Sequence, residues 1–203
     1  MIKILVLILL LVTLGSCSSV SKEVRQYRVE YKKDFLTDPR SPLKMEDLDN
    51  LKFFPPSAKA KVIAKFKLTP DEQEFEMATY SGLTRRYRKW GEASFFWGNT
   101  SARLSIYDNL SLASKPEYSD YLFLPFKDET NGVTTYGGGR YINMSKADTE
   151  DGEITIDFNK CYNPWCAYSD GFNCPIPPKE NNLAFPVKAG EKNYKGIYVA
   201  LGH

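Results

Sequence analysis

The sequence predicts a mainly β protein of the α+β type, an antiparallel β-sandwich or open barrel with one N-terminal amphipathic helix. Two changes of pattern indicate this class. Apolar residues recur every third or fourth position between residues 20 and 35, and every second position in segments after residue 60. Turn-forming sequences separate the alternating segments at short intervals, which favours strands paired antiparallel.

The N-terminus, MIKILVLILLLVTLGSC, is typical of a secretory signal. Its apolar run from Ile4 to Leu14 is shorter than the roughly 20 residues that a membrane-spanning helix needs. The end of this stretch, Leu14-Gly15-Ser16-Cys17, resembles the lipobox of bacterial lipoproteins, in which the cysteine is acylated and the peptide is cut just before it. We therefore expect lipidation at Cys17.

These boundaries divide the chain into a lipoprotein signal peptide (1–16), a lipidated tether (17–21) and a single globular domain (22–203). More than one acyl chain would anchor the domain durably to a membrane without crossing it. Ser18 and Ser19 follow the cysteine, so neither an inner-membrane retention aspartate nor a surface-directing acidic run is present. We expect a bacterial cell-envelope lipoprotein on the outer membrane, facing the periplasm.

The charge balance gives no electrostatic reason to bind nucleic acid. Removing the leader takes away one lysine and leaves a net charge of +1. The one basic and aromatic stretch, residues 83–90, reads as a strand with Arg85, Tyr87 and Lys89 on one face. The other face carries Arg86 and Arg88, so the charge is divided; a solvated strand is the first interpretation, and an anionic surface partner is the alternative.

The first regular element of the domain is expected to be a helix. An apolar stripe repeats at spacings of four and three from Val20 to Phe35, with charged residues between. Ser21 is a candidate N-cap, and Asp38-Pro39 ends the helix because proline disfavours helical geometry in the residue before it. A short helix is expected near Met45–Asn50.

The strands are expected where apolar and polar residues alternate, and one segment, Tyr121–Phe126, is apolar on both faces and reads as an interior strand. Trp97-Gly98-Asn99 and Thr130-Asn131-Gly132 are turn signals. The alternating segments centre on Val62–Leu68, Phe75–Met77, Leu104–Ile106 and Ile154–Phe158.

Polar residues between positions 136 and 181 suggest a role beyond that of a scaffold. Gly137-Gly138-Gly139 lacks the features of a P-loop or a dinucleotide fingerprint, so we expect a bulge or close backbone approach there and no cofactor. Arg140 follows directly. The candidate ligand-binding residues of this region are Tyr136, Arg140, Asp157, Asn159, Tyr162, Asn163, Glu180 and Asn181, with Asp157 and Asn159 on the non-core face of their strand.

Three cysteines lie within the stretch CYNPWCAYSDGFNC, at positions 161, 166 and 174. Zinc usually takes four ligands, and the chain has one histidine, His203, so no metal site is expected. A catalytic thiol activated by a histidine is also a poor interpretation, because His203 is the one histidine available. An oxidising periplasm favours a disulfide. Loop-closure entropy does not choose among the three pairings, which differ by less than about 1 kcal/mol.

Long polar segments between Asp128 and Lys192 resemble the sequence motifs of the domain of unknown function 1684 family of bacteria and archaea. These segments are DETNGVTTYGGGRYI, DFNKCYNPWCAYSDGFNCPIPPKENNL and AGEK. Ser41-Pro42-Leu43 and Phe53-Phe54-Pro55 resemble the N-terminal part of the family. The likeness runs from about residue 30 to 195. The family pattern has cysteines at Cys166 and Cys174 and usually a small residue at Cys161, so the resemblance implies a Cys166–Cys174 disulfide with Cys161 buried and free. It implies no activity.

Three classes of function stay open. A binding module would use Arg140 as a fork for a small anionic ligand, with Tyr136, Tyr162 and Asn163 as pocket walls and donors. A hydrolase would need two carboxylates as acid and base, from Asp128, Asp157, Glu180 and Glu191. A structural envelope protein would use these side chains as internal ties, with Arg140 paired to Asp157.

The lipid anchor is the first testable expectation. Cys17→Ser expressed in a bacterial host should give an unacylated precursor or a soluble product, whereas the wild-type chain should incorporate labelled palmitate and fractionate with membranes. Equal membrane retention of both proteins, with palmitate in neither, would show that Cys17 is not an anchor.

Overall fold

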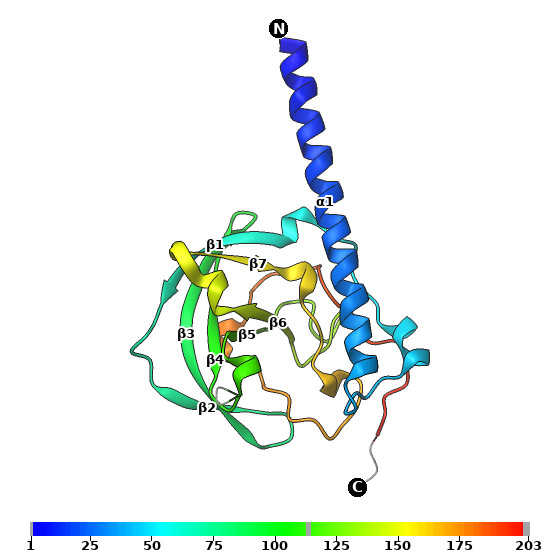
Figure 1. Cartoon of the computed structure of the whole chain (residues 1–203), viewed down its shortest axis with the longest axis vertical. Coiled ribbons are helices and arrows are strands. Elements are labelled where there is room, and N and C mark those ends of the chain that lie inside the picture. Colours follow the sequence, from blue (N-terminus) through cyan, green and yellow to red (C-terminus); the bar gives the residue numbers. More distant parts are fainter. Residues whose placement is uncertain (1, 113–114, 201–203) are drawn as a thin grey trace.

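The computed structural model describes residues 2–112 and 115–200, with side chains from residue 19 onward except those of 150 and 151. One long helix lies along the side of a strongly curled antiparallel sheet, and the first half of the helix projects beyond the domain (Figure 1). Within the described residues, no helix is both long and apolar enough to span a membrane. The side chain of Cys17 and all of His203 lie outside the described part.

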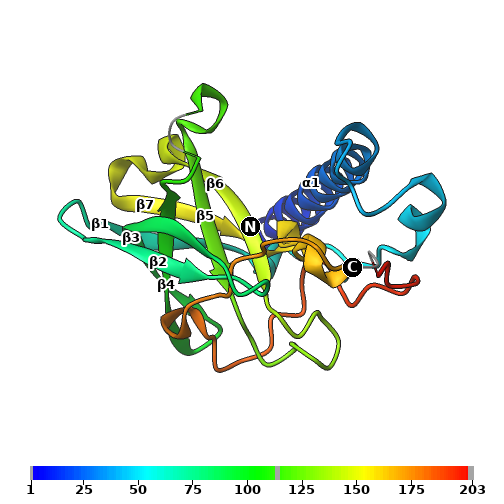
Figure 2. The same cartoon turned by 90° about the horizontal axis from the view of Figure 1, so that it is seen from below.

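The sheet has seven strands in the order β6-β5-β4-β3-β1-β7, with β2 paired to β3 outside this path. Every pairing is antiparallel. The sheet is an open half-barrel and not a two-sheet sandwich, so the open-barrel form of the predicted fold is confirmed (Figure 2). The strands are β1 Lys61–Leu68, β2 Glu74–Ala78, β3 Thr84–Trp97, β4 Thr100–Asn109, β5 Tyr121–Phe126, β6 Arg140–Ser145 and β7 Glu153–Asp157.

Strand β3 organises the sheet because it is long enough to pair with two strands on one edge. Its first half pairs with β2, its second half with β1, and its other edge with β4. A bulge between Lys89 and Gly91 separates the halves. A Cβ at Gly91 would lie 2.3 Å from the Phe66 ring, so only glycine lets β1 pack this closely on β3.

Helix α1 runs from Ile2 to Thr37 as one element. Its end before Asp38-Pro39 agrees with the sequence prediction, but Ser21 is not its N-cap, because the helix continues upstream through the apolar leader. The predicted stripe does pack on the domain, with Val24 and Phe35 buried and Tyr27 and Tyr31 half-buried.

Short 3-10 helices connect the strands, and the one predicted near residue 45 is present. Its N-cap residue Lys44 donates its backbone N–H to Asp47 Oδ2 at 2.9 Å. The 3-10 helices of the described chain are η1 Met45–Asn50, η2 Ala58–Ala60, η3 Pro116–Tyr118, η4 Lys146–Gly152, η5 Phe158–Lys160, η6 Trp165–Ala167 and η7 Lys179–Asn181.

The sheet buries side chains on both faces. The main core lies on one face, where Leu104, Leu122 and Ile142 are buried together with the C-terminal segment around Val187. On the other face of the same strands lies a second, tyrosine-rich cluster of Met77, Tyr87, Tyr107, Phe123 and Tyr141. Strand β5 contributes to both, which confirms that Tyr121–Phe126 is an interior strand.

Strand β7 ends earlier than the alternating pattern predicts. Asp157 accepts a backbone hydrogen bond from Asn159 at 3.0 Å, and residues 158–160 turn into η5. Asp157 is 7% exposed and Asn159 1% exposed, so both are buried. Asp157 points to the opposite face of β7 from the core residue Ile156, and Asn159 lies beyond the strand, in η5. The aspartate caps a turn here, which overrides the strand period.

One buried side chain takes over part of the β4–β5 ladder. The backbone pairing between these strands is confined to Tyr107 with Phe123 and Asp108 with Leu122. Asn181, fully buried in η7, supplies the missing bonds: its amide contacts the N–H and C=O of Ser105 at 2.7 and 2.8 Å and the C=O of Pro125 at 2.7 Å.

We predict that Asn181→Ala destabilises the fold by at least about 3 kcal/mol, because three buried backbone groups lose their partner at about 1 to 3 kcal/mol each. Urea unfolding measures the change. Asn182→Ala is the matched control, since the neighbouring side chain is exposed and should cost under about 0.5 kcal/mol. Equal stability of the two variants would refute a ladder role for Asn181.

Candidate functional site

Arg140, the first residue of β6, has no exposed surface. Its Nη2 forms a 2.7 Å ion pair with Asp128 Oδ2 and donates to the carbonyl of Val187 at 2.8 Å. Its Nη1 donates to the carbonyls of Ala189 and Glu191. Both terminal nitrogens are therefore occupied by the protein itself.

Asp128 completes this network. Its other oxygen, Oδ1, accepts from the N–H of Thr130 at 2.8 Å, the Thr130 hydroxyl at 2.6 Å and the N–H of Val187 at 3.1 Å. The interpretation that Arg140 pairs with Asp157 is wrong; the partner is Asp128, twelve residues upstream. The pair ties the start of β6 to the loop after β5 and to the C-terminal segment.

The glycines before Arg140 allow this close packing, as the sequence predicts. Gly139 has a φ of +93°, and a Cβ there would lie 2.7 Å from the Phe126 carbonyl oxygen and 2.8 Å from the Pro177 ring. A left-handed backbone against a neighbouring main chain requires glycine. The chain therefore enters β6 at the point where Arg140 turns inward.

Glu191 is the second fully buried acidic group of this region. Its carboxylate accepts hydrogen bonds from the Tyr168 hydroxyl at 2.7 Å, the Tyr31 hydroxyl at 2.9 Å and the N–H of Asn163 at 2.9 Å. Burial raises the pKa of Glu191 to about 7, more than these donors lower it. The carboxyl group thereby joins α1 to the loop that follows β7.

The other predicted ligand residues divide between internal ties and exposed positions. Asn159 bonds the N–H and C=O of Ser57, each at 2.8 Å, and Asn163 donates to the Lys192 carbonyl at 2.8 Å. Glu180 is exposed and accepts from the Tyr107 hydroxyl at 2.7 Å. These side chains, with Arg140, Asp157 and Asn181, line none of the hollows described below.

The cysteines behave as the family resemblance implies. Cys166 and Cys174 form a disulfide, and Cys161 is a buried free thiol whose sulfur lies 3.6 Å from the Ala189 carbonyl oxygen. Burial raises the pKa of the Cys161 thiol to about 11, which keeps it protonated at neutral pH. The disulfide closes a loop that holds Phe172 and Asn173.

Eight aromatic side chains line a hollow of about 520 Å³ on the second face of the sheet, which we call the tyrosine hollow. The sheet supplies its floor and residues 162–175 supply the opposite wall. Arg40 and Lys115 come from connecting segments. Its lining is Arg40, Arg85, Tyr87, Asn109, Leu112, Lys115, Tyr118, Tyr121, Phe123, Tyr141, Tyr162, Pro164, Trp165, Phe172, Asn173, Cys174 and Pro175.

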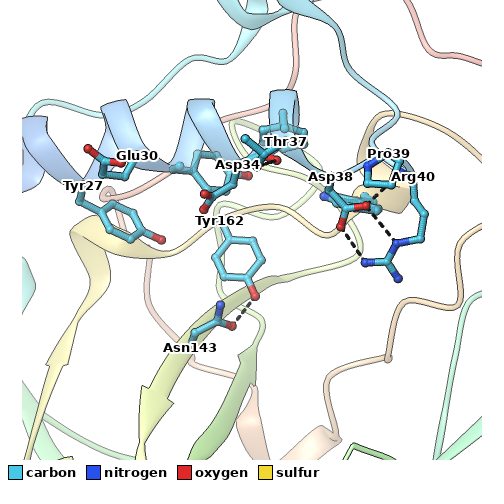
Figure 3. A pocket seen from close by; sticks show the side chains of 12 residues that line it. Tyr27, Glu30, Asp34, Thr37, Asp38, Pro39, Arg40, Asn143 and Tyr162 are labelled. Carbon is cyan, nitrogen blue, oxygen red and sulfur yellow. Dashed lines mark hydrogen bonds and ion pairs between the residues drawn. The ribbon is translucent and has the colours of Figure 1, made fainter. Parts of the chain in front are cut away.

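A second hollow of about 670 Å³ lies between the end of α1 and the strand β6, and we call it the helix hollow (Figure 3). Glu30, Asp34 and Asp38 reach it from the end of the helix. Arg40 forms a bidentate ion pair with Asp38, from Nε to Oδ1 at 3.0 Å and from Nη2 to Oδ2 at 2.6 Å. Tyr162, whose hydroxyl donates to Asn143, separates it from the tyrosine hollow. The two hollows share Arg40, Tyr162 and Trp165.

The two hollows differ in charge. Three carboxylates and one guanidinium line the helix hollow, whereas the tyrosine hollow has three cationic side chains and no carboxylate in its lining. A third hollow, of about 460 Å³, contains the predicted residue Tyr136 together with Asp170. The tyrosine hollow is therefore the one whose charge suits an anion.

No group of three or more His, Cys, Asp or Glu side chains in the described parts of the chain could hold a metal ion.

A family model described as a protein of unknown function (DUF1684) matches residues 46–192. The chain belongs to this family. A solution NMR structure of the uncharacterized protein from gene locus rrnAC0354 of Haloarcula marismortui has the same fold, with a TM-score of 0.66 and 34% identity. The match covers 84% of this chain and 92% of that one. A search of curated proteins found no match.

Sequence reasoning missed most of the tyrosine hollow as a candidate site, apart from Tyr162. One signal pointed to it: Arg85 and Tyr87 were predicted on one face of a strand whose alternative interpretation was an anionic partner, and both line the hollow. Tyr121, Tyr141 and Trp165 carried no such signal, because each belongs to a segment whose apolar pattern is already explained by burial.

The raised pKa of Glu191 predicts a pH dependence. Because folding favours its neutral form, its contribution to stability is complete below about pH 4.5 and is lost as the pH rises through 7, by about 3 kcal/mol in total. Urea unfolding between pH 5 and 8 should show this slope in the wild type and a flatter one in Glu191→Gln. Glu72→Gln, an exposed control, should keep the slope; an unchanged slope in Glu191→Gln would contradict the assignment.

Proposed function

We propose that this protein is a lipid-anchored protein of the bacterial cell envelope that binds a small anionic ligand with a flat apolar body in the tyrosine hollow. The observation that carries the proposal is the lining of that hollow: aromatic walls with cationic side chains and no carboxylate. Its volume of about 520 Å³ lies within the range of about 300 to 1,000 Å³ that small-molecule sites occupy.

The walls are suited to a flat ligand. Phe123 and Tyr141 meet edge-to-face with ring centroids 4.7 Å apart, and Tyr87 stacks on Phe123 at 5.6 Å. Trp165 and Phe172 meet at 5.1 Å in the opposite wall. Rings held by one another in this way offer apolar area at little entropic cost, because they are already ordered.

Two side chains of the hollow have unused hydrogen-bond donors. Arg85 is half-buried and donates from Nε to the Asn173 carbonyl at 3.3 Å, while its two terminal nitrogens have no acceptor among the described residues. Tyr87 is 2% exposed; its hydroxyl accepts from Asn109 at 3.1 Å, and no described group accepts its proton. A carboxylate or phosphate between them would satisfy both groups.

The disulfide supports the same role. Phe172 and Asn173 lie in the loop that Cys166 and Cys174 close, and Asn173 is the residue that orients Arg85. A covalent tie here limits the motion of the wall. The oxidised pair also agrees with an envelope location, where disulfides persist.

The membrane anchor is the part of the proposal that rests on the sequence. The lipobox-like LGSC precedes Cys17, and the helix carries the chain without interruption from this cysteine to the domain surface at Val24. A hydrolase with paired carboxylates has less support, since Asp128 and Glu191 are buried in internal networks and none of the four candidate carboxylates lines a hollow.

Thermal melts with matched small molecules test the binding proposal. Benzoate, naphthalene-2-sulfonate and phenyl phosphate should raise the melting temperature more than inorganic phosphate or benzyl alcohol. Arg85→Gln should weaken binding by about tenfold to a hundredfold, since it removes a charge-assisted hydrogen bond of about 1.5 to 3 kcal/mol.

Arg103→Gln is the matched control, because this arginine lies on β4 with its side chain 67% exposed and does not line the hollow. It should bind as the wild type does. Equal affinities of the two variants would move the site away from Arg85. A wild-type protein that no aromatic anion stabilises would leave a structural envelope protein as the better account.

A further inference from the structure

Two large apolar side chains stand in solvent on the outer surface of the sheet. Ile63 on β1 is 71% exposed and Phe96 on β3 is 70% exposed. Their strand neighbours Ala64 and Phe95 are buried in the main core, so the two side chains point away from it. Neither is needed to fill the core.

The strand register places these side chains next to each other. Lys65 on β1 lies opposite Ser94 on β3 in an antiparallel pair. Two residues further along each strand, the same register brings Ile63 opposite Phe96, on the same face of the sheet. They form one apolar pair and not two isolated exposures.

This pair lies at the end of the domain from which α1 projects. Lys61, two residues before Ile63, forms a 3.1 Å ion pair with Glu23 of α1. Trp97, which follows Phe96, packs on Phe158 of η5, and η5 contacts α1. Figure 1 shows β1 and β7 at this end, beside the emerging helix.

The distance to the proposed anchor is short. Six residues separate Cys17 from Glu23 within one helix, which corresponds to about 9 Å along its axis at about 1.5 Å per residue. A lipid anchor at Cys17 would thus bring Lys61 and the side chains beyond it within reach of lipid headgroups.

The exposed charged side chains at this end of the domain, on α1 next to Glu23 and at the start of β1, are mainly cationic. Lys22 and Arg25 of α1 and Lys59 and Lys61 beside β1 are exposed. Glu23, 42% exposed, faces Lys61 and Lys160, and its pKa is lowered by hydrogen bonds to Lys160 and Lys61. Farther along the sheet, Glu153 lies opposite Lys65 on the neighbouring strand.

We propose that this surface, made of Ile63, Phe96, Lys22, Arg25, Lys59 and Lys61, rests on an anionic lipid surface, with the two apolar side chains in the headgroup region. Exposed apolar groups flanked by lysine and arginine bind such interfaces through buried area and charge together. A second copy of the chain is a poorer occupant, because two such patches would bring like charges together.

The proposal rests on the lipid anchor of the proposed function and gives it an orientation. From Cys17 to Thr37 the helix extends about 30 Å. Asp38 and Arg40 follow at its far end, and Arg40 lines both the helix hollow and the tyrosine hollow. With the apolar pair on the membrane, the tyrosine hollow takes its ligand from the aqueous side and not from the lipid.

Fluorescence quenching in vesicles tests the orientation. Ile63→Cys and Leu83→Cys are matched, since both residues are aliphatic and exposed, and they mark opposite ends of the sheet: Leu83 precedes the first residue of β3, whereas Phe96 is near its last. The full lipidated chain is labelled with a polarity-sensitive thiol fluorophore and reconstituted into phosphatidylglycerol vesicles that contain brominated lipid. Cys161 is buried and Cys166 is bonded to Cys174, so the introduced thiol is the one that reacts.

We expect strong quenching and a blue shift at position 63 and neither at position 83. No quenching at 63, or equal quenching at both positions, in an anchored protein would overturn the proposal. The anchor is checked separately: palmitate incorporation and an unreactive wild-type chain confirm it, whereas a wild-type chain that takes the fluorophore at Cys17 refutes it. In that case Ile63→Cys and Leu83→Cys are each combined with Cys17→Ser, labelled, and added to preformed vesicles at low salt. Absence of quenching at position 63 would then also overturn the proposal that this surface binds lipid.

Discussion

The buried ion pair between Arg140 and Asp128 is the constraint on which the arrangement of the domain depends. A guanidinium without exposed surface has to satisfy its charge and its donors inside the protein. Asp128 and three carbonyl groups of residues 187–191 do this here for both terminal nitrogens, while the buried Nε has no partner among the described residues. Breaking such a pair typically costs about 3 to 5 kcal/mol, because the remaining charge stays buried and unpaired. The C-terminal segment is thereby held across the main core.

From this segment the contacts continue to the helix that carries the proposed anchor. The main-chain carbonyl of Glu191 accepts a hydrogen bond from Arg140, and its carboxylate accepts from the hydroxyls of Tyr31 and Tyr168 and from the N–H of Asn163. Tyr31 belongs to α1, and Asn163 lies between Tyr162 and Pro164, which both line the tyrosine hollow. The same buried groups therefore position both the helix and the loop that forms the candidate binding site.

The polar residues of the chain fall into two physical roles that their identities do not distinguish. Arg140, Asn159 and Asn181 are consumed by internal bonds, and each replaces backbone partners that irregular segments lack. Arg85 resembles Arg140 in chemistry, but two of its nitrogens have no acceptor among the described residues and lie beside aromatic walls. Burial and neighbours distant in sequence decide which arginine forms internal structural bonds and which is a candidate ligand group.

The sequence by itself determined the local elements: the end of α1 before Pro39, the short helix at Met45–Asn50, the interior strand Tyr121–Phe126 and the glycine approach before Arg140. These follow from period, proline and glycine, which act over a few residues. The disulfide Cys166–Cys174 was expected from the family resemblance. Only the tertiary structure decided that Arg140 pairs with Asp128, that Asp157 is buried, and that tyrosines of three strands meet Trp165 around one hollow. Such pairings depend on how the sheet curls and on which loop covers each face, and no local pattern encodes either.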